Sequence, residues 1–438
     1  MVTMGVMFAI VVALISLGGT GAMADGPDPV DFDLFFVEGA LRVDLVHSGT
    51  ATAESFSVRA IVRERYWAGS KTGLIPVADR GKYRADLRDA DSGKLIYRHG
   101  YSTLFGEWQT TAEADVVRRG FEETLRMPMP RQPVELELAV RNQEGVFESL
   151  LRIPIDPGSR LIGTGGAGGG VKVHGLIENG PANEKVDLLI LGDGYTVVER
   201  EKFLRDCAQR LADFFETEPF RSYSDRFNAR AIFVESAESG IDEPRKGIYR
   251  DTAFGMSFNT FDSPRYCMTE DVWAIHDASA HAPCDALLLM ANTSRYGGGA
   301  IYNFYTAFAS DNEFDDYLCI HEFGHGFGAL GDEYYSSSVS YNDFYPRGVE
   351  PWEPNITALL EPDGLKWNEF VEPGTPIPTP QDDPQFADRV GAFEGAGYSA
   401  KGLYRPALDC KMFSKGSREF CPVCRQAIAE MIRVYAPD

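Results

Sequence analysis

Basic residues are scarce relative to acidic ones in this chain. It has 42 Lys and Arg against 65 Asp and Glu, which gives a formal net charge of -23 at pH 7. A surface of that sign repels nucleic acid and anionic lipid headgroups, so nucleic acid is excluded as a partner. The hydrophobic fraction of 44% is ordinary for a globular protein and excludes global disorder.

Long hydrophobic runs are missing apart from one near the N-terminus. Residues 6–17 form an uncharged apolar run, which is short for a membrane span of about 20 residues. A small-x-small cleavage site follows at residues 22–24. Although residues 1–5 lack Lys and Arg, we predict a signal peptide over residues 1–24 and export to a periplasm or out of the cell. No membrane association is expected after cleavage.

Cysteine is confined to the C-terminal part of the chain, where seven occur. Because export permits disulfides, we expect a structural disulfide among Cys410, Cys421 and Cys424. A redox-active pair or half of a second zinc site are the alternatives for the Cys421-x-x-Cys424 motif. Cys267 and Cys284 are a further candidate pair, and the connectivity stays open because the odd count leaves at least one thiol unpaired within the chain.

A phosphate-binding loop is also missing. Residues 163–170 hold six glycines, but no strand precedes them and no helix start with Lys-Ser/Thr follows. We therefore predict a glycine-rich linker over residues 161–172. It separates a predicted β-sandwich domain over residues 25–160 from a catalytic domain over residues 173–438.

The two predicted domains differ in hydrophobic periodicity. Leu41, Val43 and Leu45 alternate with polar residues, as do apolar residues in 134–140, which is typical of half-buried antiparallel strands. No cluster of His, Cys and carboxylates occurs there, so a supporting or binding role is expected. The second domain is predicted to alternate strands and helices, as an α/β unit in an α+β chain. Its elements are strands over 186–191, 231–234 and 286–290 and helices over 198–216 and 425–435.

The strongest chemical motif is His321-Glu322-Phe323-Gly324-His325. An α-helix advances about 100° per residue, so His321 and His325 project from one face and can bind one Zn²⁺. Glu322 then lies beside the metal, where it can take a proton from an activated water and later give it to the leaving amine. His276 and His281, in contrast, lie in a polar stretch and are expected on the surface.

The third metal ligand is less evident from spacing. The metzincin pattern requires a histidine at position 331, where this chain has Gly331. Asp332 and Glu333 come next, and both carboxylates suit Zn²⁺. Asp332 is our prediction for the third ligand, and Glu333 is the alternative. Gly328 is expected to form the turn that brings the chain back to the metal.

Residues outside the motif suggest the rest of a metzincin-like site. Met412 is predicted to form a methionine turn beneath the metal. Residues 295–299 are predicted to belong to an edge strand that pairs with an extended substrate, or else to a plain glycine loop. Tyr398 or Tyr404 is a candidate hydrogen-bond donor to the oxyanion.

The chain resembles the M64 family of metallopeptidases, named after an immunoglobulin A peptidase. The resembling segments are residues 187–196, the zinc motif at 321–334, and C-terminal blocks at 391–398, 404–406, 410–412 and 420–424, with residues 105–111 similar to the family's N-terminal β-domain. The resemblance implies a metzincin-like catalytic domain with His321 and His325 as zinc ligands and Glu322 as the acid/base. It carries Asp332 over as a ligand and transfers no specific substrate.

The expected function is that of an exported zinc-dependent endopeptidase acting on a protein or peptide. One alternative is a catalytically silent carbohydrate- or protein-binding module with a structural metal bound by four protein ligands. Another is a zinc amidase that hydrolyses a non-peptide amide, such as an acylated amino sugar.

Overall fold

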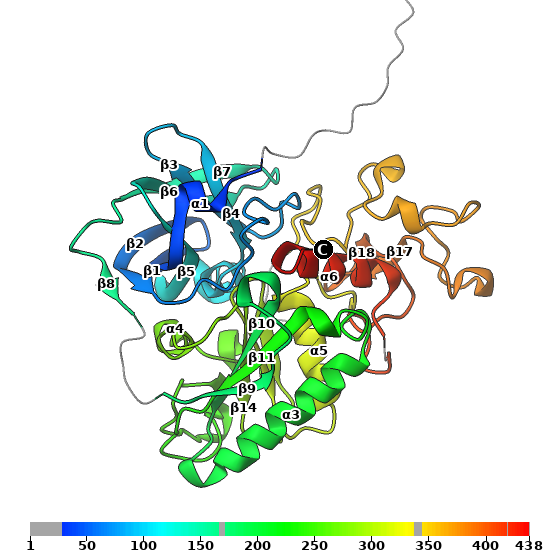
Figure 1. The fold of residues 1–438 in the computed structure, drawn as a ribbon. Helices are drawn as coiled ribbons and strands as arrows, with labels where there is room; N and C mark the ends of the chain where they lie inside the picture. The colour runs from blue at the N-terminus through cyan, green and yellow to red at the C-terminus, as the bar shows by residue number, and fades with distance from the viewer. Residues whose placement is uncertain (1–28, 166–170, 337–343, 418, 438) are drawn as a thin grey trace, which may run out of the picture.

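The computed structural model describes residues 29–165, 171–336, 344–417 and 419–437. They form a mixed α and β fold with a β-rich N-terminal region (Figure 1). The predicted signal peptide lies outside the described residues. Within those residues, no helix combines the length and the apolar character that a bilayer span requires.

The N-terminal region contains two four-stranded sheets. One has the order β5 (Arg119–Pro130), β1 (Phe36–Thr50), β2 (Ala53–Glu64) and β8 (Gly163–Thr164). The other has the order β4 (Leu95–Tyr101), β3 (Tyr83–Asp89), β6 (Val134–Arg141) and β7 (Phe147–Ile155). Neighbouring strands are antiparallel except for β2 and β8, which are parallel.

Period-two alternation explains why these sheets form a sandwich. Leu41 and Val43 of β1 are buried against Leu136 and Leu138 of β6 in one core between the two sheets. The predicted strands at these positions are therefore confirmed. Two short helices, α1 (Phe32–Phe35) and α2 (Leu104–Trp108), complete this region.

The second region is built on a six-stranded sheet. Its order is β15 (Gly298–Ile301), β16 (Tyr305–Ala309), β14 (Ala286–Ala291), β10 (Val186–Asp193), β11 (Phe227–Ile232) and β9 (Val173–Ile177). The four central strands are parallel, whereas β15 and β9 are antiparallel to their neighbours. Both faces must therefore be covered, which accounts for the uninterrupted apolar run in β10.

Helices α3 (Arg200–Glu216), α5 (Asp315–Gly326) and α6 (Pro422–Tyr435) share a core with Leu188 and Ile190, on one face of β10. Leu189 and Leu191 point to the other face, which α4 (Val272–Ser279) covers. The remaining strands form two hairpins, β12 (Ser257–Phe258) with β13 (Cys267–Met268) and β17 (Phe393–Ala396) with β18 (Ser399–Arg405). Several short 3-10 turns connect these elements.

Two predicted starts shift by three or more residues in the structure. The predicted strand over 231–234 is β11, which begins four residues earlier, and the helix predicted from 425 begins at Pro422. The apolar pattern did not predict the start of β11, because this part of the strand contains the polar residues Asn228 and Arg230. Both side chains contact the buried carboxylate of Asp187. The domain limits at 25–160, 161–172 and 173–438 stay predictions, and residues 166–170 of the linker lie outside the described residues.

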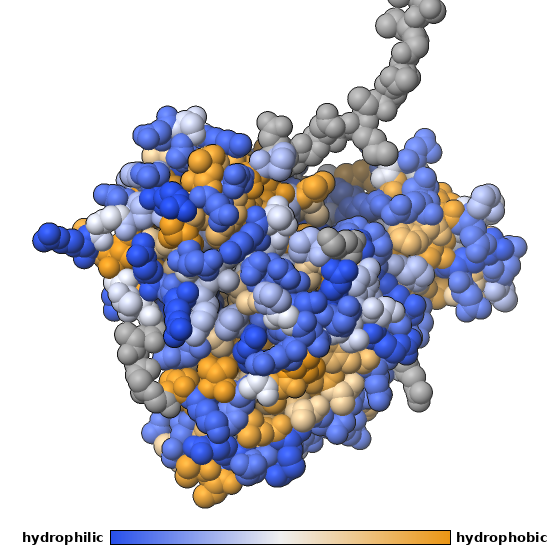
Figure 2. Space-filling view, viewed as in Figure 1, coloured by the Kyte–Doolittle hydropathy of each residue, from blue (hydrophilic) through white to orange (hydrophobic). Residues whose placement is uncertain are grey.

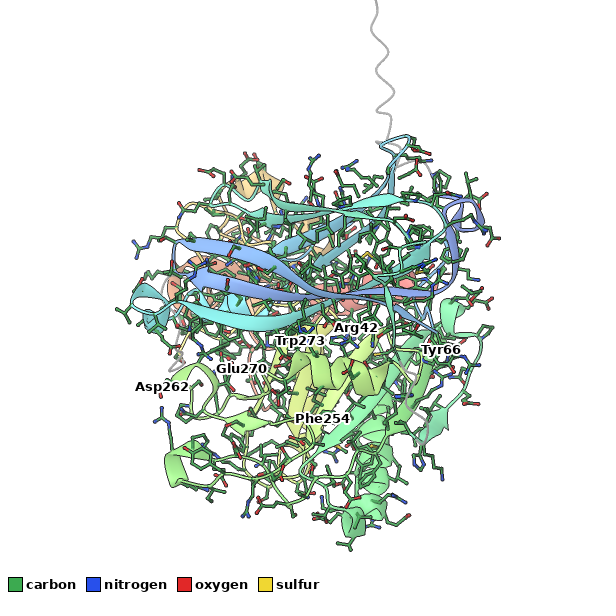
Figure 3. All side chains as sticks on the ribbon, turned by 90° about the vertical axis from the view of Figure 1, so that its left-hand side faces the viewer. Arg42, Tyr66, Phe254, Asp262, Glu270 and Trp273 are labelled. Carbon is green, nitrogen blue, oxygen red and sulfur yellow. The ribbon has the colours of Figure 1, made fainter. Side chains whose placement is uncertain are left out.

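The sandwich packs directly on the second region. Trp108 and Phe121 share a hydrophobic core with Leu191 and α4. Figure 3 shows Arg42 and Trp273 at this boundary, where Arg42 Nη1 donates to Asp277 Oδ1 at 2.7 Å. The backbone N–H of Trp273 donates to Glu122 Oε2 at 2.9 Å. These contacts fix the sandwich against the six-stranded sheet.

Figure 2 shows a face covered mostly by hydrophilic side chains, with hydrophobic patches between them. A surface of this kind does not identify a ligand.

Protonation of His99 provides a prediction about stability. Burial lowers the pKa of this β4 side chain from 6.5 to about 4, although a backbone hydrogen bond with Asn303 opposes the shift. Below pH 6.5 the imidazole of His99 binds a proton in the unfolded chain but not in the folded protein. The folded state therefore loses stability as the pH falls towards 4. At 1.36 kcal/mol per pKa unit, this loss is roughly 3 kcal/mol.

The His99→Phe variant tests the effect, because phenylalanine can stay between Tyr97 and Tyr101, on which His99 stacks. Urea denaturation at pH 7.5 and 4.5 should show a smaller loss of stability in the variant than in the wild type. Equal losses in both proteins would contradict the prediction. His276, whose pKa burial also lowers, should still contribute to the loss in the variant.

Candidate metal centre

His321 and His325 lie one turn apart on α5, as the motif predicts. Two aspartates, Asp315 and Asp316, occupy the first turn of this helix and His325 its last, an arrangement that the helix dipole favours. The Nε2 atoms of the two histidines are 3.3 Å apart. One helix thus presents two imidazole nitrogens to one point.

Asp332 completes this group from the segment that follows α5. Its Oδ1 atom is 3.3 Å from His321 Nε2 and 3.2 Å from His325 Nε2. The chain turns back through Ala329, which has a left-handed φ of 61°. Gly328 lies in the turn directly after the helix, as expected, and Ala329 supplies the left-handed residue that follows it. A Cβ at Gly328 would lie 2.7 Å from the Gly324 carbonyl oxygen, so close packing explains that glycine.

Hydrogen bonds orient both imidazoles. His321 Nδ1 lies 3.0 Å from the Lys411 carbonyl oxygen and 3.0 Å from the Tyr317 hydroxyl. His325 Nδ1 lies 2.6 Å from the Leu330 carbonyl oxygen. A carbonyl can only accept, so both Nδ1 atoms carry protons, and the Nε2 atoms are the ones that face Asp332. This is the tautomer that a metal requires.

The three donor atoms fit a tetrahedral metal ion. Metal–ligand distances of 2.0–2.1 Å place neighbouring ligand atoms about 3.3 Å apart, which matches the three separations here. Asp332 Oδ1 is buried and makes no hydrogen bond within the described residues. Asp332 Oδ2 accepts a hydrogen bond from the Tyr398 hydroxyl at 2.6 Å. A buried carboxylate oxygen without a hydrogen bond, such as Asp332 Oδ1, is suited to bind a cation.

Electrostatics couple these three side chains. Burial opposes protonation of His325, but Asp332 outweighs it and raises the pKa of His325 to about 9. Burial also disfavours the Asp332 carboxylate, yet His325 and His321 lower its pKa well below the usual range. The Asp332 carboxylate and the His325 imidazole therefore stabilise each other's charged form.

Glu333 does not join this group. Its carboxylate points to the cysteines, with Oε1 3.1 Å from Cys424 Sγ. Asn355 fixes this divergence, because its amide bonds both backbone groups of Gly331, at 2.8 and 2.9 Å, and also donates to Glu333 Oε1 at 3.0 Å. Spacing in the sequence gave no signal for Asn355.

Glu322 lies next to the three clustered side chains and lines the same cavity. Burial raises the pKa of Glu322 and the charge of Asp332 adds to the shift, whereas His321 and His325 oppose it. A Cβ at Gly298 would come within 3.1 Å of Glu322 Oε1, so strand β15 touches this carboxylate. The residue is therefore placed to move a proton at the metal centre.

The cavity over this cluster has a volume of about 420 Å³. Strand β15 and the segment after α5 form its walls, together with Tyr296, Arg265 and Tyr398. Ser102 and Glu107 of the N-terminal region also line it. The sandwich thus borders the site, which the sequence alone did not indicate.

Met412 lies beneath α5, as predicted for a methionine turn. It is fully buried, and a Cβ at Gly324 would meet its sulfur at 2.8 Å. Gly324 lies between His321 and His325 in the helix, so the thioether packs against the part of α5 that carries these histidines. The glycine inside the helix is explained by this close contact.

Of the two tyrosines predicted as donors to the oxyanion, only Tyr398 lies at the cavity. Tyr398 lines the cavity, but its hydroxyl donates to Asp332, which makes it a positioning residue for the carboxylate. Tyr404 is not among the residues that line the cavity. Sequence reasoning missed Tyr317, which bonds His321, and Arg265, whose guanidinium donates to the Tyr334 hydroxyl at 3.0 Å.

Two other expectations are wrong. All seven cysteines are free thiols, so neither the disulfide among Cys410, Cys421 and Cys424 nor the Cys267–Cys284 pair is formed. His276 is buried in α4 rather than exposed, because this helix lies between the catalytic sheet and β5. His281 is half-buried.

The contact between Gly298 and Glu322 provides a test of the geometry. In a Gly298→Ala variant the new methyl group would also lie 2.8 Å from the Ala307 carbonyl oxygen, so Glu322 must move. We expect kcat/KM to fall roughly tenfold to a hundredfold, since small displacements of catalytic groups have effects of that size. Metal content should not change. Gly163→Ala is the matched control, because its Cβ meets nothing closer than 3.8 Å, and equal rates in the two variants would contradict this geometry.

Comparison with known proteins agrees with this geometry. The family model described as IgA Peptidase M64 matches residues 175–390 and 382–432. The model described as Peptidase M64 N-terminus matches residues 31–152. No curated protein matches the chain. Because the first model alone covers more than half of the sequence, the chain belongs to the M64 family of metallopeptidases, which act on proteins or peptides.

Proposed function

We propose that this chain is a zinc-dependent endopeptidase in which His321, His325 and Asp332 bind Zn²⁺ and Glu322 is the general base and acid. The observation that carries the proposal is the convergence of three donor atoms at 3.2–3.3 Å from one another. They lie beside a carboxylate, in a cavity that an edge strand borders. A site with three protein ligands keeps a position open, which is typical of catalytic zinc.

The protein residues divide the chemistry between them. Bound Zn²⁺ supplies Lewis acidity, which activates water near neutral pH and polarises the scissile carbonyl. Glu322 accepts a proton from the attacking water and later delivers it to the leaving amine nitrogen. Tyr398, Tyr317 and the Lys411 carbonyl hold the ligands Asp332 and His321 in place.

Strand β15 is proposed to orient the substrate. It is the outer strand of the six-stranded sheet and it lines the cavity. Tyr266 bridges to Gly298 at the start of this edge. We therefore expect an extended peptide to pair with the backbone beyond Gly298, which would place its carbonyl groups over Glu322 and the histidines.

The two alternatives have less support. A silent module with a structural metal requires four protein ligands, and His321, His325 and Asp332 form a group of three within the described residues. A non-peptide amidase disagrees with membership of a peptidase family.

A peptide library with mass-spectrometric readout tests the reaction class. We expect the purified protein to cleave internal peptide bonds, to lose this activity with a zinc chelator and to regain it when Zn²⁺ is added back. If the library stays intact and the protein releases acetate from an N-acetylated amino sugar, the proposal is wrong and the protein is a non-peptide amidase.

We also propose export, supported by the apolar run at residues 6–17 and the cleavage site at residues 22–24. Intact-mass analysis of the protein made in its own cells should give a chain that begins at Asp25. A chain that retains its first 24 residues would contradict cleavage.

A further inference from the structure

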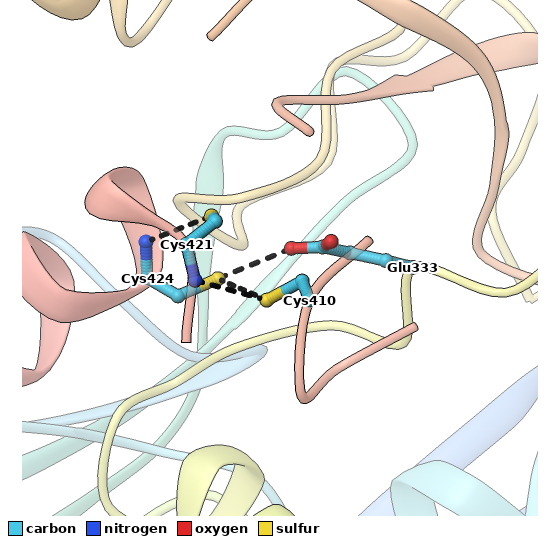
Figure 4. Close-up of side chains that lie close together, drawn as sticks. All are labelled: Glu333, Cys410, Cys421 and Cys424. Carbon is cyan, nitrogen blue, oxygen red and sulfur yellow. Dashed lines mark hydrogen bonds between the residues drawn. The ribbon is translucent and has the colours of Figure 1, made fainter. Parts of the chain in front are cut away.

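A second group of metal-ligand side chains lies behind the first. It consists of Glu333, Cys410, Cys421 and Cys424, whose donor atoms all lie within 4.8 Å of one another (Figure 4). All four residues are buried. Three come from the C-terminal segment, two of them at the start of α6, while Glu333 comes from the chain beyond α5. Glu333 thus meets three cysteines that lie 77 to 91 positions further along the chain.

The distances fit a metal ion better than a disulfide. Zinc–sulfur bonds of about 2.3 Å in a tetrahedron place two sulfurs about 3.8 Å apart. Cys410 Sγ and Cys424 Sγ are 3.8 Å apart, whereas a disulfide needs about 2.05 Å. Glu333 Oε1 lies 3.1 Å from Cys424 Sγ. The sulfur separation is that of two ligands on one ion.

The surroundings of the cluster favour anionic sulfur and leave one oxygen without a partner. The backbone N–H of Cys421 donates to Cys410 Sγ at 3.3 Å, and that of Cys424 donates to Cys421 Sγ at 3.5 Å. Both donors belong to the N-terminal end of α6, where the helix dipole stabilises negative charge. Glu333 Oε2 is buried without a hydrogen-bond partner in the described part of the chain, which is costly unless a cation is present.

We propose that Cys410, Cys421, Cys424 and Glu333 bind a second zinc ion. Four protein ligands close the coordination sphere, so this ion is structural and takes no part in the reaction. The proposal does not depend on the peptidase activity, because it rests on a different set of residues.

The second ion would brace the first centre. Glu333 directly follows Asp332, and its backbone N–H donates to the Met412 carbonyl oxygen at 3.0 Å. Cys410 directly precedes Lys411, whose carbonyl oxygen bonds His321 Nδ1 at 3.0 Å. An ion that ties Glu333 to Cys410 therefore fixes the two segments that position Asp332 and His321. This also explains why neighbouring carboxylates at 332 and 333 point to opposite sides.

Metal counting on the full-length native protein is the first test. We expect about two zinc ions per chain, one released by a thiol-specific mercurial and the other by a chelator alone. A His321→Ala/His325→Ala variant should keep the mercurial-sensitive ion, whether or not it cleaves peptides. One ion in the wild type and none in the double variant would overturn the proposal.

Cobalt substitution identifies the ligands. The Co²⁺ form of the double variant should show a sulfur-to-cobalt charge-transfer band, which Cys410→Ser weakens and Cys284→Ser, the control away from the cluster, leaves unchanged. If Cys410→Ser does not fold, the wild-type mercurial titration still decides the matter. Absence of the band, or a disulfide between any two of the three cysteines on mass analysis, would overturn the proposal.

Discussion

Replacing Glu322 by glutamine is expected to lower kcat/KM by roughly 10²- to 10⁴-fold, the contribution of a positioned general acid/base. The amide has nearly the same shape, so Gly298 and the cavity walls can stay in place. It cannot accept a proton from the attacking water, however, and so the step that generates the nucleophile fails. His321, His325 and Asp332 keep their donor atoms, and the zinc content should equal that of the wild type.

The matched control is Glu313→Gln, a carboxylate-to-amide change on the exposed segment just before α5. It should leave both rate and zinc content unchanged. Cleavage of a fluorogenic peptide and metal analysis on the same preparations give the two readouts. A Glu322→Gln enzyme with the wild-type rate would remove Glu322 from the mechanism, and simultaneous loss of zinc would assign it a ligand role instead.

Local sequence patterns predicted the parts of the fold that depend on local periodicity. The apolar run of β10 and the spacing of His321 and His325 on α5 each reflect neighbours within one element. Strand β15 was only half predicted, because its glycines carry no apolar pattern, and it was recognised through its position before α5. The start of β11 was missed because its half-buried Arg230 is paired with Asp187, a partner 43 residues away.

The rest of the site depends on contacts between distant segments. Which of two adjacent carboxylates faces the histidines is decided by Asn355, more than 20 residues further along, and by the cysteines beside α6. The cavity wall supplied by Ser102 and Glu107 arises from packing of the sandwich on the catalytic sheet. The free thiols also depend on contacts between distant segments. An oxidising compartment permits disulfides, but the distance and orientation of the cysteines decide whether they form.

Asp332→Asn is expected to weaken zinc binding by more than about a hundredfold, because loss of a direct ligand should exceed the 10- to 100-fold effect of an outer hydrogen-bond partner. The carboxylate is buried among two imidazoles, and the neutral amide cannot balance the charge of the ion. Its Oδ1 atom makes no hydrogen bond within the described residues, so the substitution sacrifices no bond of the fold at that atom. Activity should fall in parallel and recover in part at high Zn²⁺.

Titration against a competing chelator, with circular dichroism to verify folding, measures this effect. Tyr398→Phe, which removes the 2.6 Å hydrogen bond to Asp332 Oδ2, should have the smaller outer-partner effect of roughly 10- to 100-fold. Asp225→Asn on the exposed surface should have none. The order of the three variants is decisive, because a purely structural Asp332 would change stability without changing zinc affinity. If Asp332→Asn binds zinc as the wild type does while Glu333→Gln removes the catalytic ion, Glu333 is the third ligand.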